Sequence, residues 1–131
     1  MNPAHSVVNP PALGEAKGYA NGVVASGRLL FVAGQVGWDK DHQFPSGFAA
    51  QFERALANVL EVVLAAGGKA ESLTRMTIYV TDKQQYRAAT KEIGRVWREK
   101  LGRWYPAMTL VEVKALLEDA ALLELEATAV L

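Results

Sequence analysis

The last quarter of the chain constrains the fold most, because its apolar and polar side chains alternate over two long stretches. The runs 107–114 and 122–130 both alternate with the two-residue period of a β-strand. Pro106 fits the start of the first strand, where its missing N–H breaks no ladder bond. Glu118 and Asp119 predict a turn between them. We therefore expect two consecutive strands joined by that turn.

Two carboxylates interrupt this apolar region. Glu124, Glu126 and Thr128 share one face of the final strand, whereas Leu123 and Leu125 lie on the other. An unpaired carboxylate is costly to bury, so the two glutamates need water, a partner or a chemical role. Strand patterning alone favours the solvated face of an antiparallel sheet.

The composition describes an ordinary globular chain. It has 131 residues, equal numbers of acidic and basic side chains, and no cysteine. This length suits one domain spanning 1–131. The absence of cysteine excludes disulfides and thiolate catalysis and fits a cytoplasmic protein. Residues 1–17 are proline-containing and read as an irregular arm, and no apolar run is long enough to cross a membrane.

The remaining elements follow from hydrophobic periodicity and breaker residues. The sequence predicts strands at 18–25, 28–33 and 74–81, with a tight turn at Ser26–Gly27 between the first two. It predicts helices at 48–66, ended by a left-handed cap at Gly67–Gly68, and at 83–101, begun by Asp82.

The predicted order of elements is strand, strand, helix, strand, helix, strand, strand. This order indicates an α+β fold with two helices on one face of a sheet. The strand at 28–33 is apolar on both faces, with Leu29, Phe31 and Ala33 on one and Leu30 and Val32 on the other. Two helices cover only one face. Because monomers seldom expose large apolar patches, we expect a partner chain on the other.

Two polar clusters suggest ligands but have ordinary explanations. Asp39, Asp41 and His42 lie in a predicted loop at 34–47, and their spacing matches no metal motif. The basic residues of the second helix read as a solvated face, because the net charge is zero. These are Arg87, Lys91, Arg95 and Arg98. No cofactor motif is present, and we expect neither a metal nor a cofactor.

Several blocks together resemble the RidA (YjgF) reactive intermediate deaminase family. They are Tyr-Pro-Ala-Met-Thr-Leu-Val-Glu-Val at 105–113 and Leu-Leu-Glu-Leu-Glu-Ala-Thr-Ala-Val at 122–130, with Arg-Leu-Leu-Phe-Val-Ala-Gly-Gln at 28–35, the helix at 51–67 and Thr-Ile-Tyr-Val-Thr-Asp at 77–82. The blocks occur in the family's order from Gly18 onward.

The resemblance implies a chorismate-mutase-like fold and a homotrimer with a ligand cleft at each subunit interface. In the best-known branch that cleft hydrolyses enamines and imines of amino-acid metabolism. Carried over by position, Tyr19 is the cleft tyrosine, Gly34 with Ala33 supplies backbone contacts, and Glu124 positions water as the catalytic residue. Glu126 stays structural.

One departure changes the expected ligand. The family's substrate-binding arginine falls on Met108, which has no charge and donates no hydrogen bond. Losing a bidentate carboxylate clamp should weaken capture of a small 2-imino acid by at least about tenfold. Met108 with Trp104 and Tyr105 suits a larger or less acidic ligand, or simply packs the interface. The alternative cations are Arg28, Arg75 and Arg103.

Three functions remain open from the sequence. The first is a divergent hydrolase of imines, enamines or related C=N compounds, with Glu124 as general base. The second is a non-catalytic protein whose cleft binds a small metabolite. The third, a ribonuclease or translation inhibitor, is disfavoured because the chain has two isolated histidines and no net positive charge.

Overall fold

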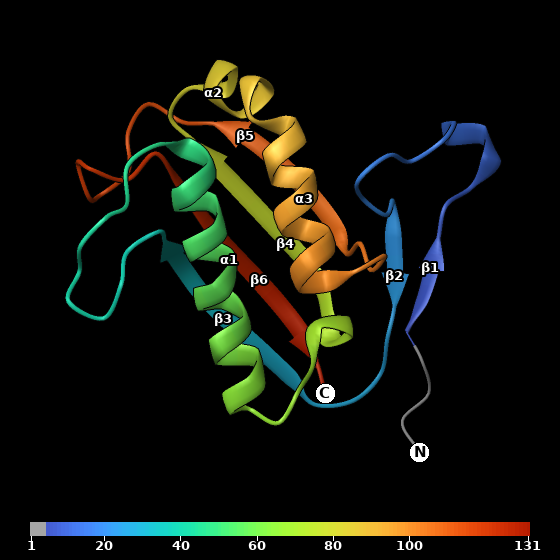
Figure 1. Ribbon diagram of the computed structural model, residues 1–131. Helices are drawn as coiled ribbons and strands as arrows, with labels where there is room; N and C mark the ends of the chain where they lie inside the picture. Colours follow the sequence, from blue (N-terminus) through green and yellow to red (C-terminus); the bar gives the residue numbers. More distant parts are fainter. Residues whose placement is uncertain (1–4) are drawn as a thin grey trace.

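The computed structural model describes residues 5–131 and places three helices on one face of a four-stranded sheet (Figure 1). The fold is therefore α+β. In chain order the elements are β1 (Ser6–Val8), the 3-10 turn η1 (Pro11–Leu13), β2 (Gly22–Val24), β3 (Leu29–Val36), α1 (Phe48–Ala65), the 3-10 turn η2 (Ala70–Ser72), β4 (Leu73–Val80), α2 (Lys83–Ala88), α3 (Thr90–Leu101), β5 (Ala107–Glu112) and β6 (Leu123–Val130).

The sheet order is β3-β6-β4-β5, which corrects the expected pairing of the last two strands. β6 is antiparallel to both β3 and β4, whereas β5 runs parallel to β4 at the edge. The helices α2 and α3 carry the chain back along β4, so β5 starts at the same end as β4 and must pair in parallel. The segment 113–122 then crosses to the far side of β4 and is no tight hairpin turn.

The predicted hairpin at Ser26–Gly27 is also wrong. β2 pairs antiparallel with β1, with Val7 opposite Val23, and this two-stranded ribbon projects from the body (Figure 1). The backbone of Arg28 instead exchanges hydrogen bonds with that of Leu131, at 3.3 and 2.8 Å, and this exchange fixes the start of β3 beside the end of β6. The arm expected to be irregular over 1–17 thus contains β1 and η1.

The helix predicted at 83–101 is two helices. Asp82 caps α2 as expected, because its carboxylate accepts a hydrogen bond from the Gln84 N–H at 2.9 Å. The chain leaves helical geometry at Ala89 (φ −104°, ψ 7°), and the Thr90 hydroxyl donates to the Arg87 carbonyl at 3.2 Å. Such a local side-chain bond competes with the helical ladder. The cap predicted after α1 is confirmed by Gly67, with φ +88°.

Between the helices and the sheet lies the apolar core. Alternate residues over most of β4 and β6 are buried in this core, including Met76, Ile78, Leu123 and Leu125. The intervening residues, among them Tyr79, Glu124 and Glu126, therefore face away from the helices. We call these two sides of the sheet the helix face and the open face.

β3 confirms the predicted division of its side chains. Val32 is buried on the helix face, whereas Leu29 and Phe31 are 60% and 74% exposed on the open face. The strand continues three residues beyond the predicted end at 33, as far as Val36. Within residues 5–131, no helix combines the length and the apolar composition that a membrane span requires.

Candidate functional site

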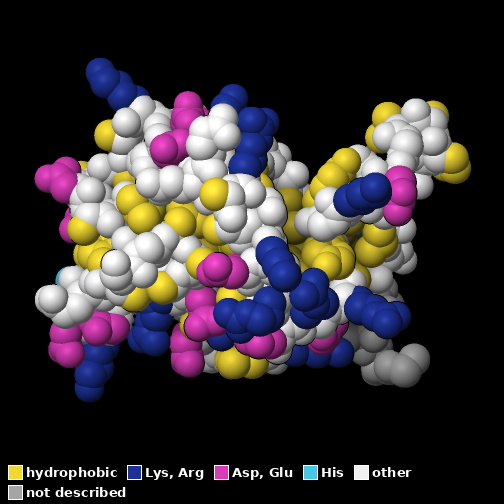
Figure 2. Space-filling view, turned by 45° about the horizontal axis from the view of Figure 1, so that its top comes forward, with side chains coloured by type: hydrophobic (Ala, Val, Ile, Leu, Met, Phe, Trp, Pro, Cys, Tyr) yellow, Lys and Arg dark blue, Asp and Glu magenta, His cyan; other side chains and the backbone are white. Residues whose placement is uncertain are grey.

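The helix face contains a cavity of about 410 Å³ between β5, α2 and α3. Its wall is mostly apolar, and the segment 17–19 closes one side. The lining residues are Lys17, Gly18, Tyr19, Phe52, Ile78, Tyr86, Thr90, Ile93, Gly94, Trp97, Tyr105, Met108, Thr109 and Leu110. Figure 2 shows exposed hydrophobic side chains where the body meets the projecting N-terminal segment.

Strand register directs Met108 into this cavity. Met108 and Leu110 lie opposite Met76 and Ile78 of β4, and paired residues in a sheet point to the same side. The segment 17–19 is held nearby because the Ala20 N–H donates to the Pro106 carbonyl at 3.0 Å and Ala20 bridges to Ala107. Three of the predicted ligand-binding residues, Tyr19, Tyr105 and Met108, therefore line one cavity.

Aromatic packing holds the floor of the cavity. The Trp97 indole N–H donates to the Trp104 carbonyl at 2.9 Å, and the Trp104 indole N–H donates to the Leu73 carbonyl at 2.8 Å. The ring of Tyr105 stacks on Trp97, with centroids 5.7 Å apart and planes 2° from parallel. Trp104 is thus a supporting residue, whereas Trp97 and Tyr105 present their rings to the cavity.

The polar groups of the cavity are few. Burial raises the pKa of Tyr86, so its hydroxyl stays protonated at neutral pH. Lys17 is the basic residue of the lining, and no aspartate or glutamate belongs to it among residues 5–131. The cavity therefore favours an apolar ligand that carries a neutral or negative polar group.

On the open face, a second group of predicted residues surrounds a β-bulge. Val32 pairs with Ala127 and Gln35 with Leu125, so β3 has one residue more than β6 in this interval, at Ala33–Gly34. A Cβ atom on Gly34 would lie 1.9 Å from the Glu124 Oε2 atom. The carboxylate of Glu124 therefore occupies the space that the missing side chain leaves, directly over the backbone of Gly34.

Glu126 has a structural partner, as expected. It accepts a hydrogen bond from the Tyr79 hydroxyl at 2.5 Å. This bond raises the pKa of Tyr79 above its usual value of 10.0, and the nearby carboxylates add to the effect. Arg75 lines a shallow hollow with Glu126 on the same face. Glu124 lies two residues along β6 from this paired carboxylate, on the same face.

The structure separates the predicted site residues into two groups within one chain. Tyr19, Tyr105 and Met108 line the cavity on the helix face, whereas Gly34 and Glu124 lie on the open face, and exposed Ala33 belongs to the same bulge. Of the alternative cations, Arg75 is on the open face and Arg28 lines a hollow near Gly68, and neither lines the cavity. Arg103 is exposed beside α3 and does not line it either.

Of the 14 lining residues, sequence reasoning assigned three to the site and missed the rest, among them Lys17 and Gly94. Gly94 carried a usable signal, because glycine inside a helix is destabilising and usually has a packing or functional reason. Lys17 carried none, because it precedes the first predicted strand.

The cluster at 39–42 is explained by the loop itself. The Asp39 carboxylate accepts hydrogen bonds from the backbone N–H groups of Asp41 and Gln43, at 2.9 and 3.0 Å. His42 stacks on Trp38, with ring centroids 3.8 Å apart. Among the residues that the structure describes, no group of three metal-ligating side chains is found. Figure 2 also shows basic side chains interspersed with acidic ones over the helices, which is typical of a solvated surface.

Comparison with known proteins identifies the family. A sequence profile described as Endoribonuclease L-PSP, which covers the RidA, YjgF and RutC proteins, matches residues 10–131. The chain belongs to this family.

Relatives and solved structures agree with this assignment. The chain is 31% identical to the 2-iminobutanoate/2-iminopropanoate deaminase of Escherichia coli K12 over 122 residues, covering 92% of this chain and 91% of that protein. A Yersinia pestis protein of the Rid family, YyfB, whose function is unknown, superposes with a TM-score of 0.87 at 30% identity and covers 98% of this chain and 99% of its own. Escherichia coli TdcF with bound serine gives a TM-score of 0.72 at 28% identity, covering 90% and 91%.

Proposed function

We propose that the chain forms a homotrimer that hydrolyses an imine, an enamine or a related C=N compound in a cleft between subunits. Relatives that bear the name deaminase, at 30–31% identity over about nine-tenths of this chain, support this class of reaction. The observation that carries the proposal is the position of the Glu124 carboxylate over the backbone of Gly34.

The separation of the two residue groups supports a shared site. Met108 faces the helices and Glu124 faces away from them, so one chain cannot bring both to the same small ligand. A neighbouring copy that places its open face beside the cavity mouth would complete the site. Each subunit would then supply a cavity to one cleft and a glutamate to the next.

The apolar open face supports assembly. Leu29, Phe31 and Val111 are exposed there, although large side chains of this kind are usually buried. These side chains lie on the same face as Glu124. An interface that covers them would exclude bulk water from the carboxylate, which strengthens its electrostatic effect on a bound substrate.

The chemistry requires a base and an electrophilic carbon. Glu124 takes a proton from water, and the water oxygen adds to the carbon of the C=N bond. Glu124 returns this proton to the nitrogen, which gives a carbinolamine. It then carries the hydroxyl proton of the carbinolamine to the amino group as the C–N bond breaks, so that ammonia leaves and a ketone remains. Residues on the cavity side hold the substrate, and the absence of a side chain at Gly34 leaves room for the Glu124 carboxylate beside the reacting carbon.

The test is ammonia release by the purified protein, measured with imines generated in situ by an amino-acid oxidase. Glu124→Gln should lower the rate by about 10²–10⁴-fold, the usual contribution of a general base. Glu126→Gln is the matched control on the same strand face, and its rate should stay close to that of the wild type. An unchanged rate in Glu124→Gln would contradict the proposal.

A second candidate is a binding protein without catalysis, favoured by the uncharged Met108 in the place of the family's arginine. Thermal stabilisation by small metabolites, without consumption of any of them, would support it. An RNA-directed activity has less support. His5 contacts the Val130 carbonyl and His42 stacks on Trp38, and neither lines the cavity.

A further inference from the structure

We infer that the cavity selects anions with a bulky apolar body, and that Lys17 and Arg98 at its mouth take the part of the guanidinium that is missing at position 108. This inference rests on the proposed function, because it names the substrate class of the same cleft. It concerns three residues that the reaction scheme does not use: Lys17, Gly94 and Arg98.

The size and lining of the cavity indicate the apolar body. Its volume of about 410 Å³ lies within the range of sites for drug-sized ligands, roughly 300–1,000 Å³. It reaches the buried side chains of Phe52 and Ile78, so its deep end belongs to the core. A three- or four-carbon acid would leave most of this apolar wall without contact, whereas a phenyl or indole ring would contact much more of it.

Gly94 makes room for such a ring. It lies in the middle of α3, where glycine is less favourable than alanine because it loses more backbone freedom on folding. An added Cβ would meet only the Arg98 Nη1 atom within 4 Å, at 3.3 Å, apart from the helix's own backbone. The side of α3 at Gly94 is thus open toward the cavity, and a larger residue there would project into it.

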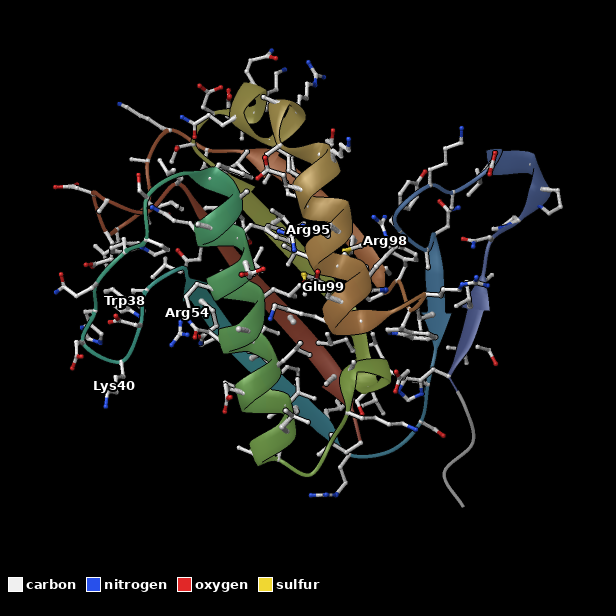
Figure 3. The ribbon with its side chains drawn as sticks, in the orientation of Figure 1. Trp38, Lys40, Arg54, Arg95, Arg98 and Glu99 are labelled. Carbon is white, nitrogen blue, oxygen red and sulfur yellow. The ribbon has the colours of Figure 1, made fainter. Side chains whose placement is uncertain are left out.

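Arg98 lies one turn after Gly94, with its guanidinium over the bare glycine. Figure 3 shows Arg98 on the side of α3 turned toward β2 and the N-terminal segment. By contrast, Arg95 on the same helix donates to Glu99 at 2.9 Å. Within residues 5–131, no ion pair engages Arg98.

Lys17 faces the same opening from the N-terminal segment. Its side chain is 80% exposed, and the nearest carboxylate oxygen, that of Glu15, is 4.0 Å away. An ion pair with this exposure and this N–O distance restrains the Lys17 ammonium group only weakly. Lys17 lines the cavity, and Arg98 lies over Gly94, which also lines it. Two cations are therefore close to a cavity whose described lining contains no carboxylate. A carboxylate group of the ligand would lie between them, with its apolar body directed toward Trp97.

The expected ligands are 2-imino acids with an aromatic or large branched side chain, and the corresponding 2-oxo acids. Phenylpyruvate is a stable probe of this class, pyruvate lacks the ring, and phenylacetone has a methyl group in place of the carboxylate. Titration calorimetry of the assembled protein should give an affinity for phenylpyruvate more than about tenfold above that for pyruvate, because the ring buries far more apolar area.

Four variants test the individual residues. Lys17→Gln and Arg98→Gln should each weaken phenylpyruvate binding by about tenfold, the effect of losing one charge-assisted hydrogen bond, and leave phenylacetone binding unchanged. Gly94→Leu should abolish the binding of both aromatic probes. Arg95→Gln, the matched control on the same helix, should change neither affinity. If Gly94→Leu does not fold, Gly94→Ala should melt at a higher temperature than the wild type yet bind phenylpyruvate more weakly.

Equal affinities for pyruvate and phenylpyruvate would overturn the inference, as would unchanged phenylpyruvate binding in both Lys17→Gln and Arg98→Gln. These outcomes are independent of the reaction. Glu124-dependent ammonia release without selectivity for phenylpyruvate would remove this inference and leave the proposed function standing. Selective phenylpyruvate binding without ammonia release from any imine would remove the catalytic proposal and leave the cavity assignment.

Discussion

The two faces of the sheet differ in how their side chains are held. On the helix face, Leu125 and its neighbours are packed on all sides by α1 and α3. On the open face, Phe31 and Leu29 have solvent where a packing layer would be, and the polar groups form pairs such as Tyr79 with Glu126. The helix face therefore carries the stability of one chain, and the open face is where the proposed interface between copies lies.

The largest expected effect is on assembly. Phe31→Arg should convert the proposed trimer into monomers and abolish ammonia release, because it buries a charge in an apolar contact. Its side chain is 74% exposed, so the fold of the chain should survive. Light scattering coupled to gel filtration measures the mass. Leu117→Arg, at an exposed loop position, is the control and should leave the mass unchanged; a Phe31→Arg protein of unchanged mass would contradict the interface.

The two faces should also respond differently to truncation. Leu125→Ala should lower the free energy of unfolding by about 2–5 kcal/mol at any protein concentration, because it leaves a cavity in the core. Leu29→Ala should have an effect that depends on protein concentration, because in the proposed trimer its partners belong to another copy. Urea denaturation at two concentrations distinguishes them. A Leu29→Ala effect independent of concentration would place that residue outside the interface.

Gly34→Ala tests the close approach of the Glu124 carboxylate to Gly34. The new methyl group would collide with the end of a flexible side chain, so Glu124 should swing away while the strand stays in place. We expect ammonia release to fall by about tenfold or more, equivalent to roughly 1.4 kcal/mol, with a melting temperature close to that of the wild type. Wild-type kinetics in Gly34→Ala would show that the position of the carboxylate is irrelevant.

The smallest expected effect depends on pH. The pKa of Tyr79 is raised in the folded state by its bond to Glu126, so this bond contributes stability that is complete below about pH 10 and is lost as the pH rises through the folded value. Tyr79→Phe should remove that alkaline loss. Thermal melting of both proteins from about pH 8 to 11 measures it, and parallel curves for the two would show that the bond does not contribute.

Local pattern and long-range pairing differed in how well the sequence predicted them. Alternation in β4 and β6 predicted which side chains are buried, because burial on one face imposes a period of two. Strand neighbours were wrong at both expected turns, because β2 pairs with β1 and β5 pairs with β4, and closeness in sequence does not decide which strands pair. The break at Ala89 was not predicted because the apolar stripe continues across it and no glycine or proline marks it.

The candidate site was predictable only in part. Glu124, Gly34, Tyr19 and Met108 followed from motif resemblance, and their chemistry follows from residue type. Their division between two faces required the register of β5 on β4, and the cations at the cavity mouth required the positions of Lys17 and Arg98 in space. Lys17 is far in sequence from the motif at 105–113, so the motif gives no information about it.

The parallel pairing of β5 has a consequence for how the cavity exchanges its contents. β5 is an edge strand, held along its length by β4 and on the other side by the isolated bridge between Ala20 and Ala107. Edge segments open at lower free energy than central strands. The wall that carries Met108 can therefore fray while the rest of the sheet stays folded. The cavity thus opens through local unfolding of β5 rather than through movement of a lid. A ligand bound in the cavity would stabilise β5 in its folded position.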